Sequence, residues 1–153
     1  MIMKFITIGK MANNNLSMVE REYVKWISRF RKLEIVELKQ VENHDDINKI
    51  ISEQEDIILR HVSHNDFVCL LDLRGKELDS IEFSKHIDNW QRLGKEIVFI
   101  FGGSYGVGPK VFERANFCWC LSKLTFPHLL ARILVLEQIF RAYKIINNQT
   151  YHK

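Results

Sequence analysis

Long apolar runs are absent from this sequence of 153 residues. None approaches the roughly 18 consecutive apolar residues that a membrane-spanning helix needs. The opening stretch MIMKFITIG is also too short an apolar run for a secretory signal. We therefore expect a soluble, cytoplasmic protein without a membrane partner.

Cysteine is scarce, and its placement argues against disulfides and metal binding. The three cysteines, Cys69, Cys118 and Cys120, fall inside apolar runs and lack C-x-x-C spacing. Buried, reduced thiols of an intracellular protein show this pattern. A zinc site at Cys118 and Cys120 is the alternative, but no third and fourth ligand stand nearby. We expect no metal.

Glycine is also scarce, with seven in the chain, and its positions exclude the common nucleotide motifs. A dinucleotide-binding fold needs G-x-G-x-x-G after its first strand, where this chain has Gly9 alone. The same absence disfavours a flavin-binding or phosphate-binding α/β protein. Gly103 and Gly108 have the spacing of a P-loop, but Pro109 stands where that loop needs its lysine.

What the sequence does contain is enough apolar material for one core. A hydrophobic content of 46% in 153 residues predicts a single domain spanning 1–153. The formal charge of +3 permits a nucleic-acid partner without requiring one. Apolar runs alternate with helical patterns five times, which predicts an α/β fold with a parallel sheet and helices on both faces. The expected strands are 4–8, 34–41, 67–73, 97–101 and 117–121.

Polar residues suggest where the first three helices begin. Ser17 and Glu20 fit a capping box for the first helix, Asp45–Asp46 begin the second, and Asp79–Ser80 begin the third. Residues 74–77 are expected to form the turn before the third. The basic residues spaced by three or four along the first helix form one stripe, which is a solvated face unless another feature points to RNA. They are Arg21, Lys25, Arg29 and Lys32.

Two loops follow the last two strands and are the expected ligand site. GGSYGVGP begins at Gly102 and LSKLTFPH begins at Leu121, and a proline starts the helix after each. Ligands of open α/β sheets bind at the carboxyl ends of strands. The first loop holds four of the seven glycines, more than a tight loop requires, which favours a loop that contacts ligand through its backbone.

The last helix and the tail give weaker signals. His128 and Arg132 are four residues apart and share a helix face, although a lone histidine is more often structural than catalytic. The helix is apolar around much of its circumference, so we expect it to lie under the loops, at a subunit interface, or both. From composition alone the polar tail NNQTYHK is a frayed end.

Taken together, these segments resemble the RlmH family of SPOUT methyltransferases. The resemblance runs from KFITIGK through LDLRGK, FIFGGSYG and LSKLTFPHLLARILVLEQIFRAYKI to the terminal YHK. It implies a homodimer that uses S-adenosylmethionine to methylate N3 of a pseudouridine in large-subunit (23S) ribosomal RNA within the assembled ribosome. It also implies a deep C-terminal trefoil knot, which spacing and composition do not indicate.

The resemblance also assigns site residues. Arg141, Tyr151 and His152 are similar to the family's substrate-side groups, with His128 and Arg132 as further catalytic candidates, and either His152 or His128 accepts the acceptor's proton. Lys153 stands where an arginine is expected, which keeps the charge but loses the bidentate fork. The implied donor-binding residues are Leu71, Gly102, Leu121, Ser122, Lys123, Leu124, Thr125 and Phe126.

The resemblance implies roles for the polar tail and for the basic stripe of the first helix. The tail becomes a lid that completes the site, in its own subunit or in the partner, and the basic stripe becomes a ribosome contact. The alternative function is a non-catalytic ribosome-binding or assembly factor that keeps the donor pocket. A damaged loop or a missing tail would favour that alternative, and the sequence has neither.

Overall fold

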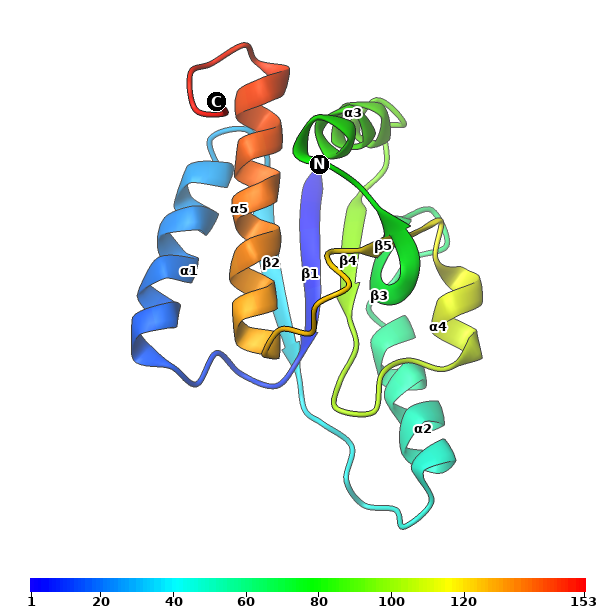
Figure 1. The fold of residues 1–153 in the computed structure, drawn as a ribbon. Helices are drawn as coiled ribbons and strands as arrows, with labels where there is room; N and C mark the ends of the chain where they lie inside the picture. Colours follow the sequence, from blue (N-terminus) through cyan, green and yellow to red (C-terminus); the bar gives the residue numbers. More distant parts are fainter.

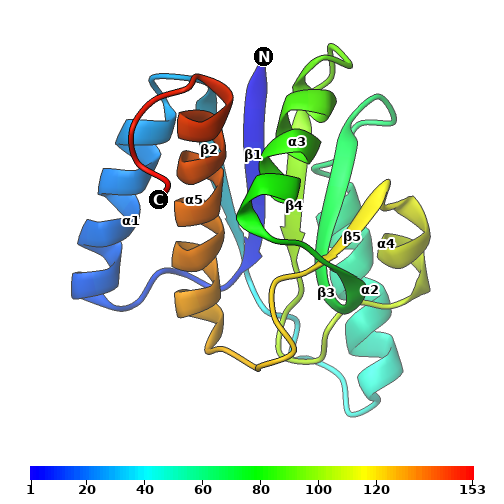
Figure 2. The ribbon, with the colours of Figure 1, turned by 45° about the horizontal axis from the view of Figure 1, so that its top comes forward.

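Five strands pair in parallel in the order β2-β1-β4-β3-β5, and the computed structural model describes all residues from 1 to 153. Helices cover both faces of this sheet (Figures 1 and 2), so the predicted α/β fold is confirmed. The strands are β1 (Ile2–Ile8), β2 (Lys32–Leu38), β3 (Phe67–Glu77), β4 (Ile97–Phe101) and β5 (Phe117–Cys120). The helices are α1 (Asn14–Ile27), α2 (Ile47–Leu59), α3 (Ser80–Gln91), α4 (Pro109–Arg114) and α5 (His128–Ile146).

The central strand β4 divides the core into two layers. All five of its residues are buried, because side chains of a strand alternate between the two faces and both faces here are covered. Ile97 and Phe99 contribute to the layer beneath α1, α3 and α5. Val98 and Ile100 contribute to the smaller layer, against α2 and α4.

The first helix begins earlier than the sequence suggested. Asn13 is its N-cap, and the Asn13 side chain accepts a hydrogen bond from the Leu16 N–H. The predicted capping box of Ser17 and Glu20 is therefore wrong, because asparagine caps a helix as well as serine does. Glu20 is buried instead.

The basic stripe is shorter than predicted. Helix α1 ends at Ile27, so of its four residues only Arg21 and Lys25 lie on the helix. Arg29 follows the helix, and Lys32 begins β2. The four basic residues therefore do not share one helical face, because only the first two lie on the helix.

The second and third helices begin where predicted. The Asp46 side chain accepts from the Asn48 N–H, and Asp79 and Glu82 form a complete capping box. The turn predicted at 74–77 is wrong, since β3 continues to Glu77 after a bulge. Leu71 and Lys76 both pair with Trp119, so residues 72–75 project from the sheet.

Gly75 allows the bulge to close against the neighbouring strand. A Cβ at this position would lie 2.6 Å from backbone atoms of Cys118 and Trp119, a contact that no side chain can relieve. The bulge therefore fixes the positions of Asp72 and Leu73 beside the ends of β4 and β5.

The cysteines, the helix lengths and the polar side chains bear on further expectations. Cys69 and Cys120 are buried free thiols, whereas Cys118 is half-buried. No helix combines the length and apolar character needed to span a bilayer. No group of three or more His, Cys, Asp or Glu side chains is arranged to hold a metal ion. The trefoil knot implied by the resemblance stays a prediction.

Candidate functional site

A pocket of about 230 Å³ lies where β3 bulges, where β4 and β5 end, and where α5 begins. This is the edge at which parallel sheets bind ligands. Seven of the eight donor-binding residues implied by the resemblance line it, and so does His128. The pocket is lined by Leu71, Asp72, Leu73, Phe101, Gly102, Trp119, Leu121, Ser122, Leu124, Thr125, Phe126, His128, Ala131 and Val135.

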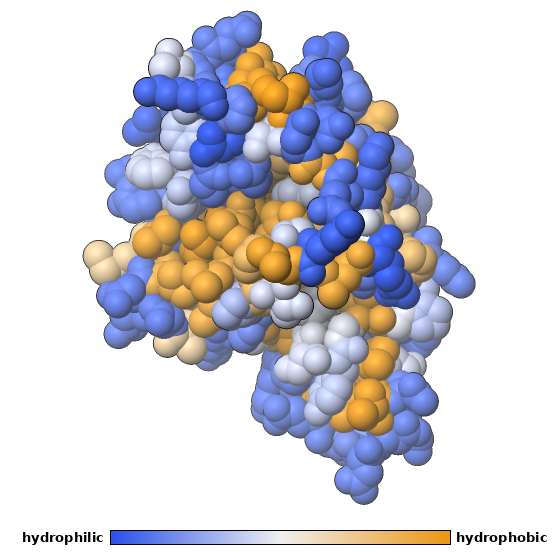
Figure 3. All heavy atoms as spheres, in the orientation of Figure 1, coloured by the Kyte–Doolittle hydropathy of each residue, from blue (hydrophilic) through white to orange (hydrophobic).

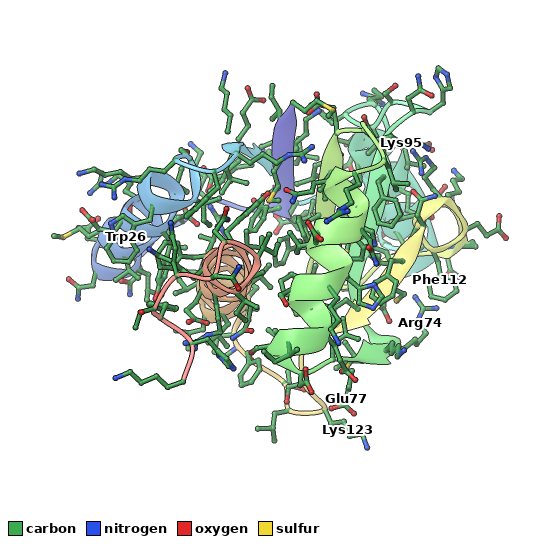
Figure 4. All side chains as sticks on the ribbon, turned by 90° about the horizontal axis from the view of Figure 1, so that it is seen from above. Trp26, Arg74, Glu77, Lys95, Phe112 and Lys123 are labelled. Carbon is green, nitrogen blue, oxygen red and sulfur yellow. The ribbon has the colours of Figure 1, made fainter.

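Lys123 is the one implied donor-binding residue whose side chain does not line the pocket. Its ammonium is 3.7 Å from the Glu77 carboxylate, and Figure 4 shows the two side chains next to each other at the molecular surface. The Lys123 side chain is therefore paired outside the pocket.

The loop from Leu121 to Phe126 presents free backbone groups. The Leu124 N–H donates to the Ser122 hydroxyl, but the N–H groups of Lys123, Thr125 and Phe126 donate no hydrogen bond within the chain. The Gly102 N–H, at the end of β4, is also free. Apolar walls with unpaired backbone donors and two hydroxyls suit a flat aromatic ring whose edge carries polar atoms.

The glycine loop is explained mostly by packing. A Cβ at Gly103 would lie 2.4 Å from the Gln40 side chain, which also accepts the Ser104 N–H. Gly106 has φ of +75°, and a Cβ at Gly108 would lie 2.5 Å from Glu55. Only Gly102 lines the pocket. The loop therefore contacts the pocket at one glycine. The other three glycines allow the loop to turn and to pack against its neighbours.

Asp72 lines the pocket and was missed by sequence reasoning. Its carboxylate accepts hydrogen bonds from the backbone N–H and the guanidinium of Arg74 at 2.9–3.0 Å. These bonds hold the pKa of Asp72 below its usual value, so the pocket wall carries an ionised carboxylate. The guanidinium lies 4.1 Å from the Phe112 ring centre (Figure 4). The available signal was an acid inside an otherwise apolar strand, FVCLLDL.

His128 and Arg132 lie in different environments despite their spacing. His128 is exposed at the pocket, whereas the Arg132 side chain is 2% exposed and bonds Glu20 and Glu37 at 2.9 Å. The Glu37 carboxylate also accepts a hydrogen bond from the Met11 N–H. Burial raises the pKa of Glu20, although Arg132 opposes the rise. Arg132 therefore fastens α5 to α1 and β2 beneath the pocket and does not face it.

The tail is folded back on α5. Asn148 has φ of +53°, and hydrogen bonds from Asn148 to Ile145 and from Gln149 to Lys144 complete a Schellman motif. The Tyr151 hydroxyl then reaches Glu137 at 3.2 Å. The interpretation of the tail as a frayed end is wrong, because this reversal returns it to the helix.

Arg141, Tyr151 and His152 form one cluster around Glu137. The Arg141 guanidinium bonds Glu137, lies 4.8 Å from the Tyr151 ring centre and is 3.1 Å from His152 Nδ1. Because a guanidinium only donates, His152 Nδ1 accepts this bond. Burial, followed by the nearby Glu137 carboxylate, raises the pKa of Tyr151 to about 12. Its phenol is therefore protonated at neutral pH.

This cluster lies far from the pocket within one chain. His128 begins α5 and Arg141 lies thirteen residues later, which at 1.5 Å per residue is a separation of about 20 Å along the helix. Figures 1 and 2 show the tail at the end of α5 opposite to the loop that enters it. The structure thus separates the residues that the resemblance implies for the donor from those that it implies for the substrate.

Between the two groups lies an exposed apolar face. Leu130 and Leu134 are exposed one turn apart on α5, and Val19 is exposed on the neighbouring α1. Figure 3 shows apolar side chains gathered over the first half of α5. A continuous apolar face of this kind marks an interaction surface more often than a free one.

Nearly the whole chain is similar to known proteins. A family model described as "Predicted SPOUT methyltransferase" matches residues 1–152. The chain is 40% identical to the ribosomal RNA large subunit methyltransferase H of Clostridium tetani, with 97% of each chain covered. It is 42% identical to a putative ribosomal RNA large subunit methyltransferase H of Methanococcus vannielii, again over 97% of each. A Pseudothermotoga lettingae protein of that name is 37% identical over 99% of each.

Proposed function

Since the chain belongs to the SPOUT methyltransferase family, we propose that it transfers a methyl group from S-adenosylmethionine to N3 of a pseudouridine in large-subunit ribosomal RNA, acting on the assembled ribosome. The observation that carries this proposal is the convergence of seven implied donor-binding residues on one pocket. The names of the relatives support an rRNA substrate. We expect the enzyme in the cytoplasm, where ribosomes are.

The pocket fits S-adenosylmethionine by its chemistry. Leu121, Leu124 and Phe126 offer apolar surface to the adenine, and the free N–H groups of Thr125 and Phe126 suit polar atoms at its edge. Ser122 and Thr125 supply hydroxyls for the ribose or amino-acid portion. When bound, S-adenosylmethionine supplies the activated methyl group, and the chain supplies alignment and exclusion of water.

The acceptor nitrogen must lose its imide proton during the transfer. His128 stands at the pocket of its own chain, and His152 stands in the tail cluster with Nδ1 turned to Arg141. His152 is a suitable general base once Arg141 turns to the substrate and frees the lone pair of Nδ1, and His128 is a suitable one as it stands. Tyr151 is not, because its raised pKa keeps the phenol protonated. We assign Tyr151 to stacking on the base and Arg141 to holding a phosphate or a carbonyl oxygen.

The separation of the two groups supports a homodimer. A tail that lies about 20 Å from its own pocket along α5 serves best above the pocket of a second copy. The apolar face formed by Val19, Leu130 and Leu134 lies between pocket and tail and suits a symmetric contact (Figure 3). In this arrangement each active site takes the donor from one protomer and the tail from its partner.

Incubation of the purified protein with methyl-labelled S-adenosylmethionine and ribosomes tests the proposal. We expect label in one nucleotide of the large-subunit rRNA, identified as N3-methylpseudouridine by mass spectrometry of nuclease fragments, and much less label in deproteinised rRNA. Ribosome binding without transfer would favour the non-catalytic factor instead. Label in the small-subunit rRNA or in protein would contradict the proposed substrate.

A further inference from the structure

A second hollow, of about 580 Å³, lies between the tail, the end of α1 and the end of α5. It is separate from the donor pocket and shares no residue with it. The side chains that matter in this groove are four aromatic rings and two cations, namely Trp26, Phe30, Phe140, Tyr151, Arg29 and Lys144.

The aromatic rings form one continuous wall. Trp26 lies 5.4 Å from Phe140 between ring centres, and Phe140 lies 4.9 Å from Tyr151 in an edge contact. Phe140 is buried, but Trp26, Phe30 and Tyr151 each keep part of their surface in solvent. Exposed ring faces held rigid by a buried neighbour are a platform on which a planar ligand can stack.

The two cations of the groove have no acidic partner. Arg29 and Lys144 make no salt bridge, and no carboxylate lines the hollow. The Lys144 ammonium lies 5.5 Å from the Phe140 ring centre. The nearest acid of the tail cluster, Glu137, is already bonded to Arg141 and Tyr151. The groove therefore combines aromatic surface with uncompensated positive charge.

We propose that this groove binds a single-stranded nucleotide that flanks the target pseudouridine, with its base stacked on the aromatic wall and adjacent phosphates on Arg29 and Lys144. Aromatic rings beside cations are the chemistry by which proteins hold unpaired RNA bases. A second copy of this chain is a poorer occupant. Its surface would remove water from two unpaired cations, and no opposite charge would compensate for the lost hydration energy. The inference rests on the proposed function, since it takes RNA as the substrate.

The position of the groove agrees with this role. Tyr151 is shared between the groove and the substrate-side cluster with Arg141 and Glu137. A nucleotide in the groove therefore lies next to the ring that we assign to the target base. Flanking contacts of this kind raise affinity for RNA without taking part in methyl transfer.

Charge reversal tests the inference. We expect the double variant Arg29→Glu, Lys144→Glu to raise KM for ribosomes at least tenfold, with kcat within twofold and donor affinity unchanged.

Neutral replacement of both by Gln should lower the slope of log affinity against log salt by about 1.4, because each phosphate contact contributes roughly 0.7 for single strands. The control is Lys49→Glu, Lys85→Glu, with the same charge change at exposed sites on α2 and α3, which should leave KM within twofold.

Tryptophan fluorescence gives an independent readout that requires no methylation. Trp90 and Trp119 are 5% and 2% exposed, so quenching by a short uridine-rich oligoribonucleotide reports mainly on the partly exposed Trp26. Saturable quenching that the Glu double variant loses is expected, and it would support the groove even if methylation of ribosomes fails. Unchanged quenching and KM in that variant would overturn this inference alone. A change in oligomeric mass of the variant would also overturn it and identify the groove as a protein interface.

Discussion

Deleting Tyr151–Lys153 is expected to lower kcat for ribosome methylation at least 100-fold, while donor affinity stays unchanged. The deletion removes the ring assigned to base stacking and one of the two candidate bases, and general-base catalysis alone contributes 10²- to 10⁴-fold. It leaves the donor pocket intact, since the tail lines none of it. Single-turnover methylation and calorimetric titration of S-adenosylmethionine measure the two effects. Undiminished turnover would contradict the role given to the tail.

Mixed dimers distinguish a tail that acts on its own pocket from one that acts on its partner. Gly102→Val damages the pocket, because even a Cβ there would lie 3.3 Å from the Gly106 backbone. Mixing that variant with the tail deletion gives heterodimers with one complete site if the tail acts on the partner. Random assortment then predicts activity of roughly a quarter of the wild type. No recovery above the separate variants would show that the tail acts in its own subunit.

Arg132→Ala is expected to cause the largest loss of stability, about 3–5 kcal/mol, because it leaves two carboxylates without their buried cation. The Arg132 guanidinium is bonded to both Glu20 and Glu37 at 2.9 Å. Such a loss is comparable with the whole stability of a small domain. Urea unfolding monitored by circular dichroism measures it.

Two controls make this second prediction specific. Arg92→Ala breaks an exposed pair with Asp88 on α3 and should cost less than about 0.5 kcal/mol. Burial already raises the pKa of Glu20, and removal of Arg132 takes away the charge that opposes this rise. The folded variant then binds a proton at Glu20 at a higher pH than the unfolded chain does. The variant should therefore regain stability as the pH falls. A loss below 1 kcal/mol, or one independent of pH, would contradict the structural role of Arg132.

Local patterns in the sequence predicted most elements of the fold. The buried runs of β3 and β4 are continuous because both faces of these strands are covered, and Asp79 capped α3 as expected. The strand order was beyond reach, since the register of β1 with β4 joins residues more than ninety positions apart. The extension of β3 was missed because Gly75 resembles a turn glycine until its contact with β5 is seen.

The candidate site was predictable where it depends on strand ends and unpredictable where it depends on distant partners. Gly102 and the loop after β5 follow from the rule for parallel sheets, whereas Leu71 was implied only by the family resemblance. Arg132 has partners 112 and 95 residues away, so its spacing from His128 gave a misleading signal. The folding back of the tail depends on one left-handed residue, Asn148, which composition alone does not indicate.

A crystal structure of the protein grown with S-adenosylmethionine is the decisive measurement for the proposed donor site. We expect the donor between Gly102 and the loop 121–126, with its adenine among Leu121, Leu124 and Phe126. A donor bound elsewhere, or no donor between these two loops at saturating concentration, would contradict it.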